Sequence, residues 1–241
     1  MKMFSNAWKV CLLLLPMLGS AEEYVVATRL DESLVVPTAT MLTSDWTNSV
    51  LWLTADSPVL NESTTTATWL DFSPEHNDAT QTDTDKQPDR VYTNGAWAWD
   101  FDGVDDSISL DTDEFYVDST KTNSRTLDMT FVIEGGVNQY LFETKGFAIL
   151  YVASLNEIRA GVSGADAGLS SGYAVGTDGW CNISVTYSTN LISATLNNAP
   201  FSGGETTVYS AYSDCGAILG VRDNGSLPYS GSIKKIKGYS K

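Results

Sequence analysis

The fold of this chain is decided by one stretch, Trp97-Ala98-Trp99-Asp100-Phe101-Asp102-Gly103-Val104-Asp105-Asp106-Ser107-Ile108-Ser109-Leu110. Trp97, Trp99 and Phe101 share one face of an alternating segment, and Ile108 and Leu110 share one face of a second segment. An acidic turn that contains a glycine separates the two. The pattern predicts a β-hairpin whose apolar face lines a core.

Length and composition indicate the same architecture. The chain has 241 residues, of which 42% are hydrophobic, and this is enough for one sizeable core. Short alternating runs are separated by turn signals such as Asn94-Gly95 and Gly135-Gly136, and no long run with helical period follows residue 25. These features predict an all-β sandwich in a single domain.

Four motifs in order resemble a known family, the concanavalin A-like jelly rolls of laminin G type. Residues 101–106 are similar to its "Phe-Asp-Gly-x-Asp-Asp" phrase, and the other similar stretches are residues 51–56 with 69–80, residues 180–187 with 194–198, and residues 218–225 with 229–233. The resemblance covers about residues 50–241. It implies a two-sheet antiparallel jelly-roll sandwich, preceded by an N-terminal apolar segment and an arm.

The N-terminal region is predicted to lie outside this sandwich. Residues 1–21 combine basic flanks, a short apolar run and small residues, so they resemble a secretory signal peptide, with an uncleaved apolar segment as the alternative. Residues 22–48 are interpreted as a linker or an N-terminal arm, or as a first strand of the same domain. The sandwich itself is expected over residues 49–241, and the protein is expected to be secreted or displayed on an extracellular surface.

The cysteines are compatible with export. Removal of residues 1–21 would leave Cys181 and Cys215, an even pair suited to one disulfide in an oxidising compartment. Two buried thiols are the alternative.

The charge excludes one class of partner. The chain has 14 Lys and Arg against 30 Asp and Glu, a formal net charge of −16, so nucleic acid is not expected to bind. The C-terminal segment is the exception, because four lysines gather around the last expected strand: Lys234, Lys235, Lys237 and Lys241. They either protect an edge strand from unwanted pairing or dock on an acidic neighbouring subunit.

Catalytic patterns are missing from the sequence. The "Glu-x-Asp-x-x-Glu" pattern of glycoside hydrolases with this fold is not found, and Asp111 and Asp113 lie in a turn-like context. The single histidine, His76, lies in an acidic loop rather than on a strand. The chain is therefore predicted not to be an enzyme.

Calcium is the cofactor that the sequence suggests, because members of the resembled family often bind it near the loop that Asp71 begins. Two acidic turns offer the oxygen ligands that this hard cation needs, and the candidate ligands are Asp71, Asn77, Asp78, Asp102 and Asp106. The chain departs from the family at Ile233-Lys234-Lys235-Ile236, where many relatives carry "Ile-Asp-Glu-Val". The alternative is that the acidic turns only cap strands.

Lectins of this fold hold sugars in shallow loops with an aromatic side chain and a few polar groups. The matching candidates near the last strands are Arg222, Asp223, Asn224 and Tyr229, whereas Trp97 and Trp99 share the face of Phe101 and are expected in the core. The leading hypothesis is a non-catalytic glycan-binding or adhesion module. The alternative is a structural surface subunit of a virion or appendage that contacts neighbouring subunits, and the third is a polysaccharide-active enzyme.

Overall fold

The computed structural model describes residues 23–24, 41–42, 48–56, 67–110, 124–144, 147–161, 169–173, 175, 179–188, 191–202, 216–222 and 225–240. Within them almost all regular structure is β. The exception is a short 3-10 helix, η1 (Thr84–Lys86). Strands β1 (Glu23–Tyr24) and β2 (Met41–Leu42) pair with each other and belong to the predicted arm. Residues 1–21, the predicted signal peptide, lie outside the described part.

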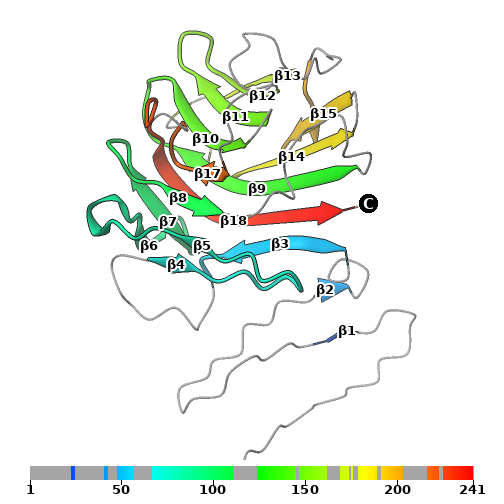
Figure 1. Cartoon of the computed structure of the whole chain (residues 1–241). Helices are drawn as coiled ribbons and strands as arrows, with labels where there is room; N and C mark the ends of the chain where they lie inside the picture. The colour runs from blue at the N-terminus through cyan, green and yellow to red at the C-terminus, as the bar shows by residue number, and fades with distance from the viewer. Residues whose placement is uncertain are drawn as a thin grey trace, which may run out of the picture.

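The remaining strands form two antiparallel sheets that face each other (Figure 1). The first, called here the β18 sheet, has the order β16 (Ala199–Pro200), β15 (Leu191–Leu196), β14 (Cys181–Ser188), β9 (Arg125–Ile133), β18 (Ser230–Ser240), β7 (Ala96–Asp102), β6 (Asp89–Thr93), with β3 (Ser49–Thr54) also on β18. The second, called the β10 sheet, has the order β13 (Leu169–Gly172), β12 (Glu157–Gly161), β11 (Phe147–Val152), β10 (Gln139–Thr144), β17 (Ala217–Leu219), β8 (Ile108–Leu110), β5 (Ala79–Thr80), β4 (Thr68–Trp69). The predicted two-sheet sandwich is confirmed.

The hairpin predicted for residues 97–110 is wrong, however. β7 pairs with β6 and β18 in one sheet, and β8 pairs with β17 and β5 in the other. The acidic turn therefore carries the chain across the core from sheet to sheet. Alternation on both segments requires only that Phe101 and Ile108 face the same core, and a crossing between two facing sheets satisfies this as well as a hairpin does.

The core between the sheets is filled by alternate residues of both. Its two largest fully buried side chains, Trp69 and Trp99, stack on each other, with ring centroids 3.6 Å apart and planes 10° apart. Phe101 packs edge-on against Trp69 on one side and against Tyr229 on the other. These four rings come from β4, β7 and the segment before β18, so the core joins parts of the chain that are far apart in sequence.

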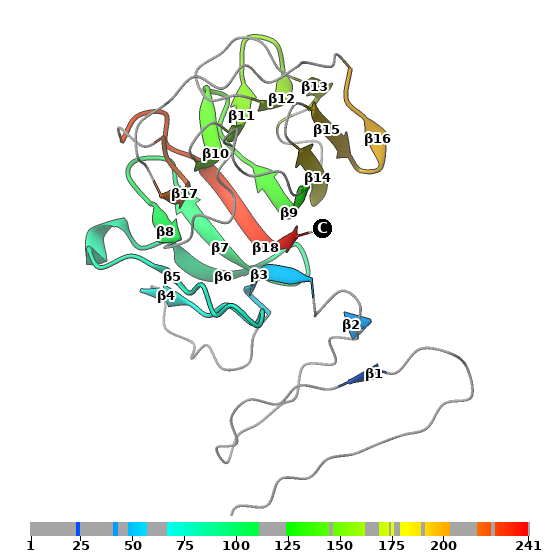
Figure 2. The same ribbon diagram turned by 45° about the vertical axis from the view of Figure 1, so that its right-hand side comes forward.

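The long strand β18 organises its sheet (Figures 1 and 2). One edge pairs along its length with β9, and the other edge is divided: residues 230–233 pair with β7, and residues 235–239 pair with β3. The register shifts between Ile233 and Lys235, which marks a β-bulge at Lys234. β7 and β3 thus meet end to end beside this bulge.

Candidate functional site

An exposed aromatic cluster lies on the β6–β7 hairpin, at the edge of the β18 sheet. The turn of this hairpin is Asn94-Gly95, with φ of 50° and 78°, which is the geometry that an Asn-Gly pair favours in a two-residue turn. Tyr92 and Trp97 lie directly opposite each other across the hairpin, with their rings edge to face at 5.5 Å. Tyr92 is 64% exposed, whereas Trp97 is half-buried.

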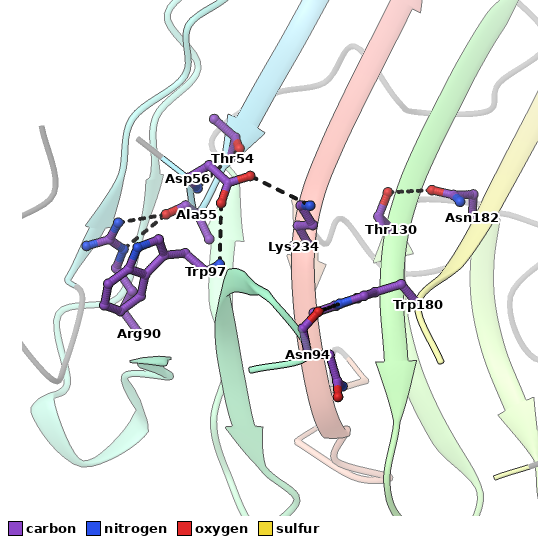
Figure 3. Close-up of polar contacts among 10 residues, drawn as sticks. All are labelled: Thr54, Ala55, Asp56, Arg90, Asn94, Trp97, Thr130, Trp180, Asn182 and Lys234. Carbon is purple, nitrogen blue, oxygen red and sulfur yellow. Dashed lines mark hydrogen bonds and ion pairs between the residues drawn. The ribbon is translucent and has the colours of Figure 1, made fainter. Parts of the chain in front are cut away.

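Arg90 fixes the orientation of this cluster. Its guanidinium lies over the Trp97 ring, 4.2 Å from the ring centroid, which is a cation–π contact (Figure 3). Its Nε and Nη2 both donate hydrogen bonds to the carbonyl oxygen of Ala55, at 3.0 and 2.9 Å. Trp97 is thus held from one side by a cation that is itself anchored to the backbone at the end of β3.

Asp56 links the cluster to the β-bulge. Its carboxylate accepts a hydrogen bond from the backbone N–H of Trp97 at 3.3 Å and lies 3.8 Å from the Lys234 ammonium (Figure 3). The backbone N–H of Ala55 donates to the Lys234 carbonyl at 3.0 Å. Both charged side chains remain substantially exposed, 46% for Asp56 and 32% for Lys234, so each presents polar atoms to solvent.

Trp180 contacts the turn of the same hairpin. Figure 3 shows its indole reaching across toward the β6–β7 turn, where Nε1 donates to the carbonyl of Asn94 at 3.3 Å. Asn182, two residues further, is exposed and accepts from the Thr130 hydroxyl at 2.7 Å through its side-chain oxygen. Because Cys181 and Ile183 are buried in the core, Asn182 projects from the outer face of the sheet, whereas Tyr92 and Trp97 share the face of Trp99. We call the surface around Tyr92 the Tyr92 surface; it comprises Asp56, Arg90, Tyr92, Trp97 and Lys234.

The Tyr92 surface combines two kinds of chemistry. Tyr92 and Trp97 supply flat apolar area. The Asp56 carboxylate and the Lys234 ammonium lie beside them and offer both hydrogen-bond acceptors and donors. Such a surface can hold a ligand that has one apolar face and several hydroxyl groups.

The predicted ligand residues lie elsewhere. Arg222 is half-buried on the other sheet, with Nε 3.9 Å from the buried Glu143 carboxylate and its guanidinium 5.6 Å from the Tyr140 ring centroid. Asp223 and Asn224 lie outside the described residues. The prediction that Tyr229 binds a ligand is wrong, because its side chain is fully buried and its hydroxyl donates to the carbonyls of Val132 and Ser232. Burial raises the pKa of Tyr229, so it is a neutral core residue and not part of a rim.

The predicted metal ligands of the first acidic loop are occupied by the protein itself. The buried Asp71 carboxylate accepts four hydrogen bonds: from the backbone N–H groups of Trp52, Ser73 and Asn77 at 2.7, 2.9 and 2.7 Å, and from the Ser73 hydroxyl at 2.6 Å. Asp78 accepts from the Asp71 N–H at 2.8 Å, and the Asn77 amide donates to the Val50 carbonyl at 3.0 Å. These contacts fit a carboxylate that folds the loop better than a calcium site.

The second acidic turn is organised in the same way. Asp102 accepts from the N–H groups of Val104 and Asp105, and Asp106 accepts from the Asp102 N–H at 2.9 Å. Burial, with the nearby charges of Asp102, Asp105 and Asp89, raises the pKa of Asp106 to about 6.

Among the described residues no three acidic, histidine or cysteine side chains gather as a metal site would require. Calcium binding at Asp71, Asn77, Asp78, Asp102 and Asp106 stays a prediction. The disulfide prediction involves Cys215, which lies outside the described residues, so it stays a prediction; Cys181 is buried in the core.

Within the described part of the chain, no helix is long and apolar enough to cross a membrane.

Sequence reasoning missed the Tyr92 surface. It placed Trp97 in the core with Trp99, because the two share a face of one strand, but Trp97 is only partly buried and packs against the margin of the core. The available signal was local: Arg90 and Tyr92 alternate on a short strand that leads into the Asn94-Gly95 turn. Their approach to Asp56 and Lys234 depends on long-range pairing that this pattern does not report.

Known proteins resemble the chain in fold only. No protein-family model and no curated protein matches it. Among solved structures, the botulinum neurotoxin serotype D binding domain has a TM-score of 0.58 at 12% identity, covering 82% of this chain and 49% of that one. Trypanosoma rangeli sialidase has a TM-score of 0.55 at 15% identity, covering 86% of this chain and 32% of the sialidase. The same sialidase in complex with sialic acid has a TM-score of 0.56 at 15% identity, covering 80% of this chain and 31% of the sialidase.

These neighbours are β-sandwich-containing proteins, and the chain spans about half of one and a third of the other. The expectation that the chain is not an enzyme is contradicted, because sialidases are among the proteins that share its fold. That expectation relied on the absence of known catalytic motifs, and absence of a motif excludes only that motif. At these identities the likeness shows the fold alone.

Proposed function

We propose that this chain is an extracellular carbohydrate-binding module that holds a glycan on the Tyr92 surface. The observation that carries the proposal is the exposed Tyr92 ring beside Trp97, bordered by the charged pair of Asp56 and Lys234. The fold is compatible with it, since the solved neighbours include a toxin binding domain and a sialidase in complex with sialic acid.

The chemistry of a sugar suits this arrangement. One face of a pyranose ring carries C–H groups that pack on an aromatic ring, and its hydroxyls need donors and acceptors at the border of that ring. Tyr92 provides the ring, Asp56 accepts hydrogen bonds, and Lys234 donates them. Arg90 keeps Trp97 in place, so that little ordering is needed when the ligand binds.

The test is a glycan array followed by titration calorimetry with the best glycan. Tyr92→Ala and Trp97→Ala should each weaken binding by about tenfold or more, because each removes ring area worth at least about 1.4 kcal/mol. Leu155→Ala is the matched control, since this side chain is also exposed, at 52%, but lies on another turn. Its affinity should match that of the wild type.

Two outcomes would overturn the proposal. One is an array on which no glycan binds above background. The other is a glycan that binds equally well to the wild type and to both aromatic variants, which would place any sugar site elsewhere on the molecule. Circular dichroism of each variant separates a lost site from a lost fold.

A further inference from the structure

A different surface lies at the end of the sandwich where β18 begins. Val104 and Val137 are 69% and 64% exposed, and they lie on the β7–β8 and β9–β10 turns. Both turns lie against Ser230: a Cβ added at Gly103 or at Gly135 would lie 2.7 or 3.2 Å from the Ser230 Cβ. The two aliphatic side chains therefore occupy neighbouring turns.

This end is also acidic. Asp102 pairs with Ser230 from β7, and Glu134 donates its backbone N–H to the Ser230 carbonyl at 2.9 Å from the other side. Both carboxylates are exposed, and Asp105 lies beside Val104 on the same turn. We call this surface the turn end; it comprises Asp102, Val104, Asp105, Glu134 and Val137.

Further along β18 the surface carries lysines instead of acidic residues. Ile236 is fully buried, so Lys235 and Lys237 on either side of it project from the outer face of the sheet. The Lys237 ammonium lies 4.7 Å from the centroid of the half-buried Trp52 ring, and Phe72 packs edge-on against this ring at 6.0 Å. We call this surface the lysine strip; it comprises Lys235, Lys237 and Trp52, with Asp128 paired in register beside Lys237.

The two surfaces complement each other in charge and in apolar content, but they do not meet within one molecule. Ser230 and Lys235 are five residues apart on a single strand, which corresponds to roughly 17 Å. The two surfaces can contact each other only between separate molecules. A second copy of the chain carries both surfaces at equal concentration.

We propose that the chain associates head to tail, with the turn end of one copy on the lysine strip of the next. Asp105 and Glu134 then face Lys235 and Lys237, and the Val104 and Val137 side chains contact Trp52. Because the two surfaces differ, the contact is heterologous and repeats from copy to copy instead of closing into a two-fold dimer. This inference is independent of glycan binding, since the Tyr92 ring takes no part in it.

Sedimentation velocity and light scattering over a concentration series test the proposal. The wild type should form dimers and longer species as concentration rises, and salt should reduce them, because the Debye length falls from about 30 Å at 0.01 M to about 3 Å at 1 M. Asp105→Lys with Glu134→Lys should give a monomer, and so should Lys235→Glu with Lys237→Glu. Circular dichroism checks that both double variants are folded.

The decisive experiment mixes the two charge-reversed variants. Each repels itself, but the reversed head of one is complementary to the reversed tail of the other, so the equimolar mixture should recover association. A wild type that remains monomeric at all concentrations, or a mixture that remains monomeric, would overturn the proposal. So would a monomer that sediments with phosphatidylcholine vesicles through Val104 and Val137, since a lipid surface would then be the partner.

Discussion

Two tryptophans of one strand end up in different environments. Trp99 and Trp97 are two residues apart on the same face of β7, yet Trp99 is 1% exposed and stacked on Trp69, while Trp97 lies half-buried under Arg90 and beside the exposed Tyr92. Their difference arises at the bulge. Trp99 is the last β7 residue that pairs with β18, and the N–H of Trp97 turns to the Asp56 side chain instead.

The core therefore ends where strand pairing ends, and one alternating pattern supplies both a core residue and a surface residue. If this view is right, substitutions at the two tryptophans should separate stability from binding. Substitutions nearer Trp99 should mainly reduce the free energy of unfolding. Substitutions nearer Tyr92 should mainly reduce affinity for a ligand.

The largest effect is expected for Trp99→Ala. The stack on Trp69 would be replaced by a cavity between the sheets, and such changes cost about 3–5 kcal/mol. The buried indole N–H of Trp99 has no acceptor among the described residues, so Trp99→Phe should cost distinctly less. Urea unfolding of both variants measures this, and equal losses would contradict the assignment of the stack as the main contribution.

The next largest effect is expected for Asp71→Ala, which should reduce the free energy of unfolding by about 2–4 kcal/mol. The backbone N–H groups around this buried carboxylate would lose their acceptor. The same loop positions Trp69, two residues before Asp71, and so supports the stack on Trp99. Asp78→Ala removes only one acceptor from this loop and serves as the milder control. Addition of calcium or of a chelator should leave the unfolding midpoint of the wild type unchanged; a rise with calcium would restore the metal hypothesis.

The fold could be predicted from the sequence because its signals are local or repetitive. Alternation on β7 and β8, the Asn94-Gly95 turn and the β14–β15 pair are all features of short stretches. The connection between β7 and β8 was not accessible in this way. A hairpin and a crossing between sheets need the same alternation and a similar turn, so only long-range pairing with β18 and β17 distinguishes them.

The candidate site was hardly accessible for the same reason. Tyr229 looked like a rim residue because polar residues and a glycine precede it, but its hydroxyl reaches two carbonyls inside the molecule. Asp71 looked like a metal ligand because acidic loops bind cations, but its acceptors are used by backbone N–H groups from β3 and its own loop. Both cases turn on which partner a polar side chain meets, and that depends on the tertiary structure.

Trp97→Ala should reduce the free energy of unfolding by about 1–2 kcal/mol, which is less than for Trp99→Ala. The Trp97 side chain is only half-buried, and its removal loses one cation–π contact. Its effect on glycan affinity should exceed that of Trp99→Phe, which leaves the surface intact. Urea unfolding and calorimetry on the same preparations provide both quantities. A stability loss as large as that of Trp99→Ala would mean that the core extends further along β7 than the Lys234 bulge.

A modest pH dependence is expected from the turn that follows Phe101. The pKa of Asp106 is raised to about 6 from an ordinary value of 3.8, so the folded state binds the proton more tightly than the unfolded state. The stabilising contribution is therefore complete below pH 3.8 and is lost as the pH rises through about 6. Between wild type and Asp106→Asn, the difference in unfolding midpoint should change over this window, and a difference that is constant from pH 4 to 7.5 would contradict the raised pKa.

The smallest effect on stability is expected for Tyr92→Ala, within about 0.5 kcal/mol, because a ring that is 64% exposed contributes little to the core. Tyr92→Phe keeps the ring and its edge-to-face contact with Trp97 and removes only the hydroxyl. If stacking carries the binding, Tyr92→Phe should retain most of the glycan affinity that Tyr92→Ala loses. If both variants lose it equally, the hydroxyl rather than the ring contacts the ligand, and the Tyr92 surface would be a hydrogen-bonding site instead of an aromatic one.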